Sequence, residues 1–186
     1  MDTKLLEVQI GVLTGADAFA VFQLERSVFT SEAWSEALVL EELTRPDRLY
    51  VGAYDEGELV AYGGVRLAED TDLMTLGVSR AARGQGLGRA VLEELLRRVQ
   101  LVRFLGPRVF HLPERVPVHE PGEIEHLVRR VQRVLLEVRA SNSVAQQLYE
   151  SVGFRRVGTI RGYYHQPRED ALVMECPIVP NTRATY

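Results

Sequence analysis

The period of the hydrophobic residues changes several times along this chain, and each change marks an expected element. Short alternating or continuous apolar runs predict strands, whereas apolar residues three or four positions apart predict helices. Strands are expected at residues 6–13, 49–54, 59–67, 72–78, 133–138, 155–161 and 171–178. Helices are expected from Thr14 to about residue 28, from about 34 to 43, after the glycines at 84–88, and from about 143 to 152. The order β-α-α-β-β-β-α-β-α-β-β predicts an α/β fold, with one mixed sheet, helices on both faces and a single domain spanning residues 1–186.

Residues that start and stop helices agree with these boundaries. Thr14, Ser35 and Asn142 are the expected N-caps, because their side chains can accept a backbone N–H of the first turn. Pro46 ends the second helix, and Gly153 is a stop signal for the last one. The apolar faces are expected at Phe19, Phe22 and Leu24, at Leu92, Leu95, Leu96 and Val99, and at Val144, Leu148 and Val152.

Residues from about 105 to 132 interrupt the pattern. Half of the eight prolines fall here, and they predict an irregular insert followed by a short amphipathic helix with Ile124, Leu127, Val128 and Val131. Three histidines of the insert match no zinc spacing, so no metal site is expected: His111, His119 and His126. The sequence from Arg97 to Arg133 contains eight arginines and four glutamates. This local positive charge suits contact with an acidic protein or with ribosomal RNA, or else a segment that is simply exposed to solvent.

Composition narrows the class of protein. The 186 residues are 46% hydrophobic and 26% charged, which suits one soluble domain with a substantial core. No apolar run approaches the ~20 residues of a membrane span, and the N-terminus lacks a signal-peptide pattern. Because Cys176 is the single cysteine, no intrachain disulfide is expected and a cytoplasmic location is the default. The net charge of −4 carries no nucleic-acid signature.

A glycine-rich segment, Arg83-Gly84-Gln85-Gly86-Leu87-Gly88, joins the strand at 72–78 to the next helix. Such a turn at a helix N-terminus exposes backbone N–H groups beside the positive end of the helix dipole, so it suits a phosphate or pyrophosphate. A Rossmann motif would need glycine at Arg89 or Val91, and a P-loop would need Lys-Ser or Lys-Thr after its last glycine. The pattern that remains is R-x-x-G-x-G. The alternative to a phosphate-binding loop is an ordinary turn between a strand and a helix.

The R-x-x-G-x-G spacing resembles the acetyl-CoA pyrophosphate loop of the GCN5-related N-acetyltransferases (GNAT). Further segments resemble the RimI-type members, the bacterial acetyltransferases of ribosomal-protein N-terminal alanine: L-E-V-R-A-S-N at 136–142, L-Y-E-S-V-G-F at 148–154, and G-Y-Y at 162–164 with R-E-D-A-L-V-M at 168–174. Trp34-Ser35 matches their early W-S element. The resemblance covers about residues 24–178. The insert has no counterpart in short family members, and Arg161-Gly162 stands where an Arg-Asn pair is common.

The resemblance implies acetyl-CoA as co-substrate and a mixed seven-stranded sheet. The residues implied in cofactor binding are Leu76, Gly77, Val78, Arg83, Gly84, Gln85, Gly86, Leu87, Gly88, Arg89 and Asn142. The segment 76–78 would pair with pantetheine through its backbone, or it is an ordinary core strand. Arg83 and Arg89 would contact phosphate, or they lie on a solvated helix start. Asn142 would contact the cofactor, cap its helix, or do both.

Amine acetylation by a thioester needs a base for the ammonium and an acid for the departing thiolate. Glu137 is the candidate base because it interrupts an apolar strand, where partial burial would raise its pKa. Tyr149 is the candidate acid at the edge of an apolar helix row. The alternatives are a solvent-facing strand residue and a packed aromatic; the family match favours catalysis at both. Tyr163, Tyr164 and Trp34 are either walls for a peptide N-terminus or packing aromatics.

The leading hypothesis is therefore a cytoplasmic N-acetyltransferase that uses acetyl-CoA. The resemblance implies that its substrate is a protein N-terminal amine, the alanine of small-subunit ribosomal protein S-eighteen. Transfer would be direct, because no cysteine lies near the expected site. Two alternatives stay open: an acetyltransferase of small amines or antibiotics, and a non-catalytic acyl-CoA-binding regulator. Neither nucleic acid nor a membrane is expected as a direct partner.

Overall fold

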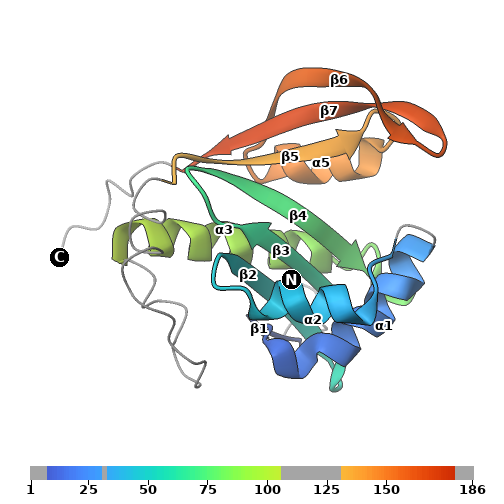
Figure 1. Ribbon diagram of the computed structural model, residues 1–186, viewed down its shortest axis with the longest axis vertical. Helices are drawn as coiled ribbons and strands as arrows, with labels where there is room; N and C mark the ends of the chain where they lie inside the picture. Colours follow the sequence, from blue (N-terminus) through green and yellow to red (C-terminus); the bar gives the residue numbers. More distant parts are fainter. Residues whose placement is uncertain (1–7, 31–32, 106–130, 179–186) are drawn as a thin grey trace. The chain divides into compact units, whose positions relative to one another are not determined.

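The computed structural model describes residues 8–30, 33–105 and 131–178 (Figure 1). The elements follow the expected order: β1 (Gln9–Val12), the short 3-10 helix η2 (Gly15–Asp17), α1 (Ala18–Phe29), α2 (Glu36–Thr44), β2 (Arg48–Asp55), β3 (Glu58–Arg66), β4 (Asp70–Val78), the 3-10 helix η4 (Arg80–Ala82), α3 (Leu87–Leu105), β5 (Arg133–Arg139), α5 (Ser143–Ser151), β6 (Arg155–His165) and β7 (Arg168–Pro177).

The seven strands form one mixed sheet in the order β1-β2-β3-β4-β5-β7-β6. Strand β2 pairs antiparallel with β1 and with β3, and β7 pairs antiparallel with β5 and with β6, whereas β4 and β5 run parallel. A parallel pair requires a long crossover, which here contains α3. The α/β class and the seven-stranded mixed sheet predicted from the sequence are confirmed.

The chain divides into two compact units, which share β4 and α3 between them. The first unit comprises Met1–Arg66 and Leu73–Leu96, and the second comprises Leu67–Asp72 and Arg97–Tyr186. The first three residues of β4 thus belong to the second unit and the rest of the strand to the first. The prediction of a single domain over residues 1–186 stays a prediction.

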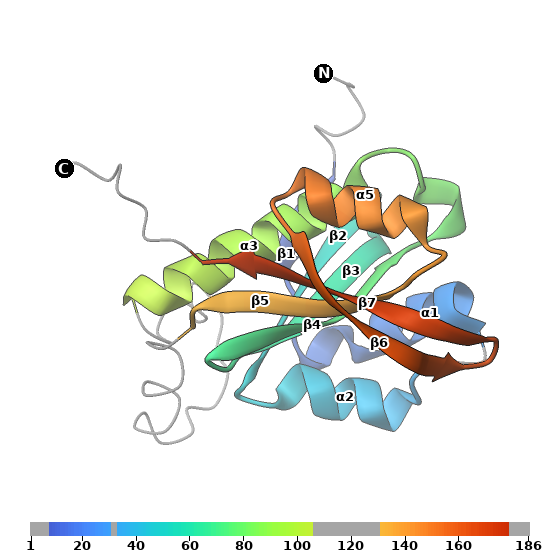
Figure 2. The same ribbon diagram turned by 90° about the horizontal axis from the view of Figure 1, so that it is seen from above.

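In the first unit, helices cover both faces of the sheet (Figure 2). Tyr62 of β3 lies in a buried core with Val21 of α1 and Val39 of α2. The next residue, Gly63, faces the other way, since a Cβ atom built there would lie 3.0 Å from Leu95 of α3. Successive strand residues point to opposite faces, so α1 and α2 lie on one side of β3 and the start of α3 on the other.

A buried ion pair fastens α2 to β2. The Nε atom of Arg48 lies 2.6 Å from an oxygen of Glu42, and the Tyr50 hydroxyl donates to the same oxygen at 2.9 Å. The side chains of Arg48 and Glu42 are only 7% and 9% exposed. Removing one partner would leave a buried charge uncompensated, so this contact ties the helix firmly to the strand. The sequence pattern did not indicate it.

The predicted caps of the first two helical segments are confirmed. Thr14 and Asp17 form a reciprocal capping box, in which the Asp17 carboxylate accepts the Thr14 N–H at 2.8 Å. The Ser35 hydroxyl accepts the Leu38 N–H at 3.3 Å, at the start of α2. Gly153 follows α5 with a φ of 104°, as expected of a glycine that ends a helix.

Two predicted apolar faces are wrong at one position each. Phe19 is 62% exposed, because α1 turns a different stripe inward; its buried residues are Ala18, Val21, Leu24 and Glu25. Those positions recur three or four apart, whereas Phe19 lies off the stripe despite its size. Val144 is 78% exposed in the first turn of α5, and none of the residues of that helix is buried. Leu148 and Val152 are half-buried.

In the second unit, β7 lies between β5 and β6, and α5 connects β5 to β6 along the chain. Alternate residues of β5 are buried, namely Val134, Leu136 and Val138. The hairpin of β6 and β7 is longer than predicted, because only Gln166 and Pro167 separate the two strands.

The expected insert falls largely on residues 106–130, outside the described residues, and its three histidines with it. In the described part of the chain, no three side chains of His, Cys, Asp or Glu are grouped so as to hold a metal ion. No helix there is long and apolar enough to cross a membrane.

Candidate active site

The glycine-rich loop in the first unit leaves its backbone open. Gly84 and Gly86 have φ angles of 76° and 82°, and a Cβ atom built on either would meet nothing within 4 Å. Leu87, in contrast, is buried and anchors the start of α3. The first backbone N–H groups of a helix have no intrahelical partner and lie at its positive end. The loop therefore leaves room for a phosphate group close to its backbone at Gly84 and Gly86, and binding of acetyl-CoA there stays a prediction.

Polar side chains of the loop fold back onto neighbouring backbone. Arg83 Nε donates to the Val78 carbonyl at 3.3 Å, and the Gln85 amide donates to the Ala81 carbonyl at 3.1 Å. Arg89 pairs with Glu93 one turn later at 2.8 Å on the exposed face of α3. Both arginines are exposed, and an exposed pair of this kind contributes only about 0.3–0.5 kcal/mol. Phosphate binding by either arginine stays a prediction.

Residues Leu76, Gly77 and Val78 form the end of β4, directly before the loop. Gly77 is buried, and a Cβ atom there would lie 2.9 Å from the Tyr62 ring and 3.3 Å from the Phe29 ring. Only glycine fits between these rings. The parallel ladder with β5 involves Asp70–Asp72 of β4, and the segment 76–78 lies beyond it. Backbone pairing of this segment with pantetheine stays a prediction.

Glu137 lies in the second unit, at the middle of β5, opposite Val173 of β7. Its neighbours Leu136 and Val138 are buried, whereas its own side chain is exposed on the other face. Partial removal from water, followed by the negative charge of Asp72, raises its pKa above the ordinary glutamate value. The predicted rise in pKa is confirmed; the role as a base remains a proposal.

Tyr149 lies on α5 and is half-buried. Burial, with a smaller contribution from the Tyr164 phenol, raises its pKa to about 12. Its ring packs against Phe154 with centroids 5.7 Å apart and ring planes 57° apart. The phenol is therefore protonated at neutral pH and able to donate a proton or a hydrogen bond.

Asn142 caps α5. Its side-chain oxygen accepts the Ala145 N–H at 3.1 Å, which confirms the capping role. The side chain is exposed. Contact with acetyl-CoA stays a prediction for this residue.

Two of the predicted aromatic residues, one in each unit, make contacts that the sequence pattern did not indicate. The Tyr164 hydroxyl donates to the Glu137 carbonyl at 3.4 Å, although the two residues are 27 positions apart. In the first unit, the Trp34 N–H donates to a carboxyl oxygen of Glu25 at 3.2 Å. Glu25 is 2% exposed. A charged residue on the buried stripe of α1 was the available signal for it.

Known proteins are similar to this chain in sequence over most of its length. The model of the acetyltransferase (GNAT) family matches residues 18–106. The N-alpha-acetyltransferase RimI of Mycobacterium tuberculosis is 36% identical over 173 residues, 90% of this chain and 90% of the relative. A ribosomal-protein-S-eighteen-alanine N-acetyltransferase of Salmonella typhimurium is 32% identical over 172 residues, 91% of this chain and 97% of the relative.

Solved structures give the same result. The ribosomal-protein-S-eighteen-alanine N-acetyltransferase of Escherichia coli is 27% identical and has a TM-score of 0.72, with 96% of this chain and 99% of that chain covered. NAA60 of Arabidopsis thaliana in complex with acetyl-CoA shares the fold, with a TM-score of 0.69 at 17% identity over 92% of this chain and 98% of that chain. Sequence identity above 30% over nine-tenths of both sequences indicates common descent. This chain therefore belongs to the GNAT family, as an acetyl-CoA-dependent N-acetyltransferase of the RimI type.

Proposed function

We propose that this enzyme acetylates the N-terminal α-amine of a protein, and that its substrate is the N-terminal alanine of ribosomal protein S-eighteen. The support for the substrate comes from the relatives in Salmonella typhimurium and Escherichia coli, whose names give that alanine. These relatives align with 91% and 96% of this chain.

The observation that carries the proposed chemistry is an accessible carboxyl group with a raised pKa and a protonated phenol, both in the second unit. The pKa of Glu137 is raised, so its carboxylate is a stronger base than an ordinary glutamate. The pKa of Tyr149 is raised to about 12, so its phenol holds a proton at neutral pH. General bases and acids work best when their pKa lets them carry the correct charge and still exchange a proton.

In the proposed reaction, Glu137 accepts a proton from the substrate ammonium through a water molecule. The amine nitrogen then attacks the thioester carbonyl carbon, a C–N bond forms, and the C–S bond breaks with its electron pair on sulfur. Tyr149 protonates that sulfur and recovers a proton from the nitrogen, which becomes an amide. Glu137 releases its proton to solvent.

The test is an acetylation assay with acetyl-CoA and a peptide that begins Ala-Arg. Mass spectrometry should find one acetyl group on the α-amine and none on a matched peptide with a blocked N-terminus. Acetylation of small amines alone would replace the proposal with a small-amine acetyltransferase. Binding of acetyl-CoA without turnover on any amine would replace it with a regulator. In cells, loss of the gene should leave the alanine of S-eighteen unacetylated.

A further inference from the structure

The pairing of β6 with β7 is irregular directly before Tyr164. Ile160 pairs with Ala171, and the next pair is Tyr164 with Glu169. Three residues of β6 therefore face the single residue Asp170. Bulges of this kind re-aim the side chains that follow them.

Gly162 makes this bulge possible. Its φ angle is 61°, in the left-handed region that favours glycine, and its N–H donates to the Asp170 carboxylate at 2.8 Å. A Cβ atom at Gly162 would lie 3.3 Å from the Arg168 side chain. The bulge is thus held by a charged acceptor and allowed by the missing side chain.

Beyond the bulge, Tyr164 reaches across a strand. It stands on β6, and its hydroxyl donates to the carbonyl of Glu137 on β5 at 3.4 Å. Since β7 lies between those two strands, the side chain must pass over β7 to make this contact. Tyr164 therefore ties the outer hairpin to the backbone of the candidate base.

Arg139 holds the Tyr164 ring in place. Its guanidinium carbon lies 4.0 Å from the centre of the ring, a cation–π contact, and its two terminal nitrogens donate to the Pro167 and Gln166 carbonyls at 3.4 and 3.3 Å. It also pairs with Glu169 at 3.4 Å. We name Arg139, Tyr164 and Glu169 the Tyr164 clamp.

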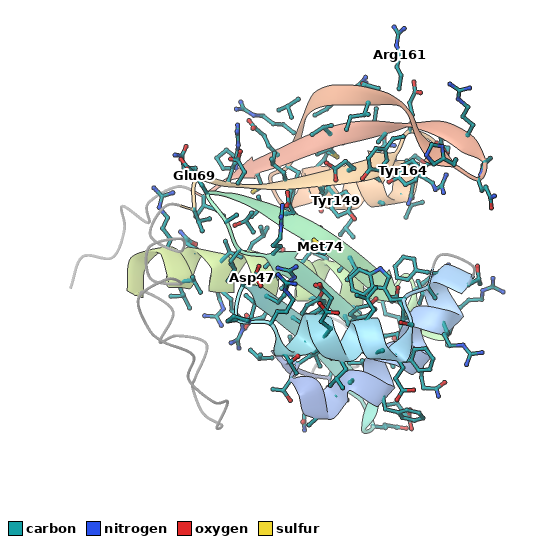
Figure 3. All side chains as sticks on the ribbon, in the orientation of Figure 1. Asp47, Glu69, Met74, Tyr149, Arg161 and Tyr164 are labelled. Atoms are coloured by element: carbon teal, nitrogen blue, oxygen red, sulfur yellow. The ribbon has the colours of Figure 1, made fainter. Side chains whose placement is uncertain are left out.

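The Tyr164 clamp is itself anchored at the junction of β5 and α5. The Glu169 carboxylate accepts the Ser141 N–H at 2.5 Å, and this bonding lowers the pKa of Glu169. The negative charge that Tyr164 gains when it ionises disfavours ionisation of Tyr149, and so contributes, after burial, to the raised pKa of Tyr149. Tyr164 on β6 and Tyr149 on α5 are both labelled in Figure 3. The clamp thus touches the backbone of the candidate base directly and acts on the candidate acid through electrostatics.

We propose that Tyr164 is a positioning residue for acetyl transfer, which holds the Glu137 backbone from the far side of β7 and keeps the base in register with Tyr149. The inference rests on the proposed function, because it takes Glu137 and Tyr149 as base and acid. Tyr164 does not itself exchange a proton with the substrate. Its contribution is to the rate of the chemical step rather than to binding.

The test compares Tyr164→Phe with Tyr54→Phe. Both variants lose one hydrogen-bonding hydroxyl and keep the ring; the Tyr54 hydroxyl donates to the Asp17 carboxylate at 2.7 Å in the first unit. Tyr164→Phe should lower kcat about 10-fold, equivalent to about 1.4 kcal/mol of barrier, and leave KM for both substrates within about twofold. It should also displace the acidic limb of the pH–rate profile. Tyr54→Phe should retain the kcat and the profile of the parent.

A double-mutant cycle separates positioning from other roles. In a Glu137→Gln background, Tyr164→Phe should cost little more, because the group that it positions is already gone. If the double variant loses kcat by the product of the two single losses, the proposal is wrong. It is also wrong if Tyr164→Phe raises the KM for the peptide and leaves kcat unchanged. Arg139→Met should reproduce part of the loss by releasing the ring.

The failure of this inference is distinct from failure of the proposed function. If Glu137→Gln is slow but Tyr164→Phe has full activity, the inference is wrong and the proposed function stands. If the parent enzyme acetylates another amine and no peptide, the proposed substrate is wrong. The same variants are then compared on that amine, where the 10-fold loss is still expected.

Discussion

Among the described residues, each unit holds one glutamate whose pKa is raised, and the two differ in every other respect. Glu25 in the first unit is 2% exposed, and burial raises its pKa to about 7. One of its oxygens accepts the Trp34 N–H, and the other finds no hydrogen-bond partner in the described part of the chain. Glu137 in the second unit is exposed, and it gains its raised pKa from partial desolvation and from Asp72.

The comparison teaches that a raised pKa alone does not identify a catalytic base. A base must exchange its proton with substrate and solvent, which requires an accessible carboxylate. Glu25 is buried in the core and accepts a backbone hydrogen bond just before α2, so its raised pKa results from burial alone and cannot serve proton exchange. Glu137 is accessible to solvent, so its carboxylate with a raised pKa can take up a proton from a substrate.

The largest expected effect is that of Glu137→Gln. Loss of the base should lower kcat about 10²–10⁴-fold and leave acetyl-CoA binding nearly unchanged, as measured by steady-state kinetics and calorimetry. Glu25→Gln is the matched control, and its kcat should stay within about threefold of the parent, because no proton passes through it. A larger loss of kcat in Glu25→Gln than in Glu137→Gln would show that Glu25 is the base.

The same variant predicts the pH dependence. The Glu137 carboxyl accepts a proton only when ionised, so the activity of the parent should fall as pH falls through its raised pKa. Glu137→Gln should lack that limb and keep the limb due to the substrate amine, whose pKa is about 7.7–8.0. A parent profile without an acidic limb of its own would count against the assignment.

Tyr149→Phe should have the second largest effect, a loss of about 10²-fold in kcat. The ring stays in contact with Phe154, so the free energy of unfolding should change by less than about 1 kcal/mol. Urea denaturation checks the second part. Full activity in this variant would leave Glu137 without its acid partner.

Glu25 predicts a change in stability rather than in rate. Its folded pKa of about 7 exceeds the ordinary value of 4.5, so the folded state binds the proton more tightly than the unfolded state. Its stabilising contribution is complete below the unfolded pKa and is lost as pH rises through about 7, by about 3 kcal/mol at most. Urea denaturation from pH 4.5 to 8 should show this loss in the parent and not in Glu25→Gln. If the free energy of unfolding depends on pH equally in the parent and in Glu25→Gln, the pKa of Glu25 is not raised by folding.

The smallest effect is expected in the glycine-rich loop, which tests cofactor binding in the first unit apart from proton transfer. Gly86→Ala places a side chain at a φ of 82°, which costs about 1–2 kcal/mol, and should raise the Kd for acetyl-CoA by at most about 5–30-fold. Gly11→Ala is the control, because space is open there too and its φ is ordinary. An unchanged Kd in Gly86→Ala would argue that the loop is a plain turn.

Local signals predicted the fold well. Ser35 and Gly153 mark helix ends by short-range chemistry that the sequence displays directly. Phe19 was misassigned because size suggests burial, whereas the neighbouring elements decide which stripe of a helix turns inward. The buried ion pair of Arg48 and Glu42 depends on the packing of α2 against β2, which no periodicity reports.

The sequence predicted which residues are candidates for the site, but it did not predict the contacts that those residues make. Glu137 was recognisable because a charge interrupts an apolar strand. The contact of Tyr164 with the Glu137 carbonyl depends on the register of β6 against β7 and on a bulge at Gly162. Register is a property of paired strands, so a pattern along one strand does not contain it.

Ile178, which directly follows β7, holds together two parts of the second unit that are distant in sequence. Its carbonyl accepts a hydrogen bond from Arg103 near the end of α3, and its N–H donates to the Gln132 carbonyl just before β5. A linker grafted between α3 and β5 would therefore begin and end near positions that one residue already fastens. Because the entropy of loop closure depends only weakly on length, linkers of different lengths should cost the fold nearly the same at this position.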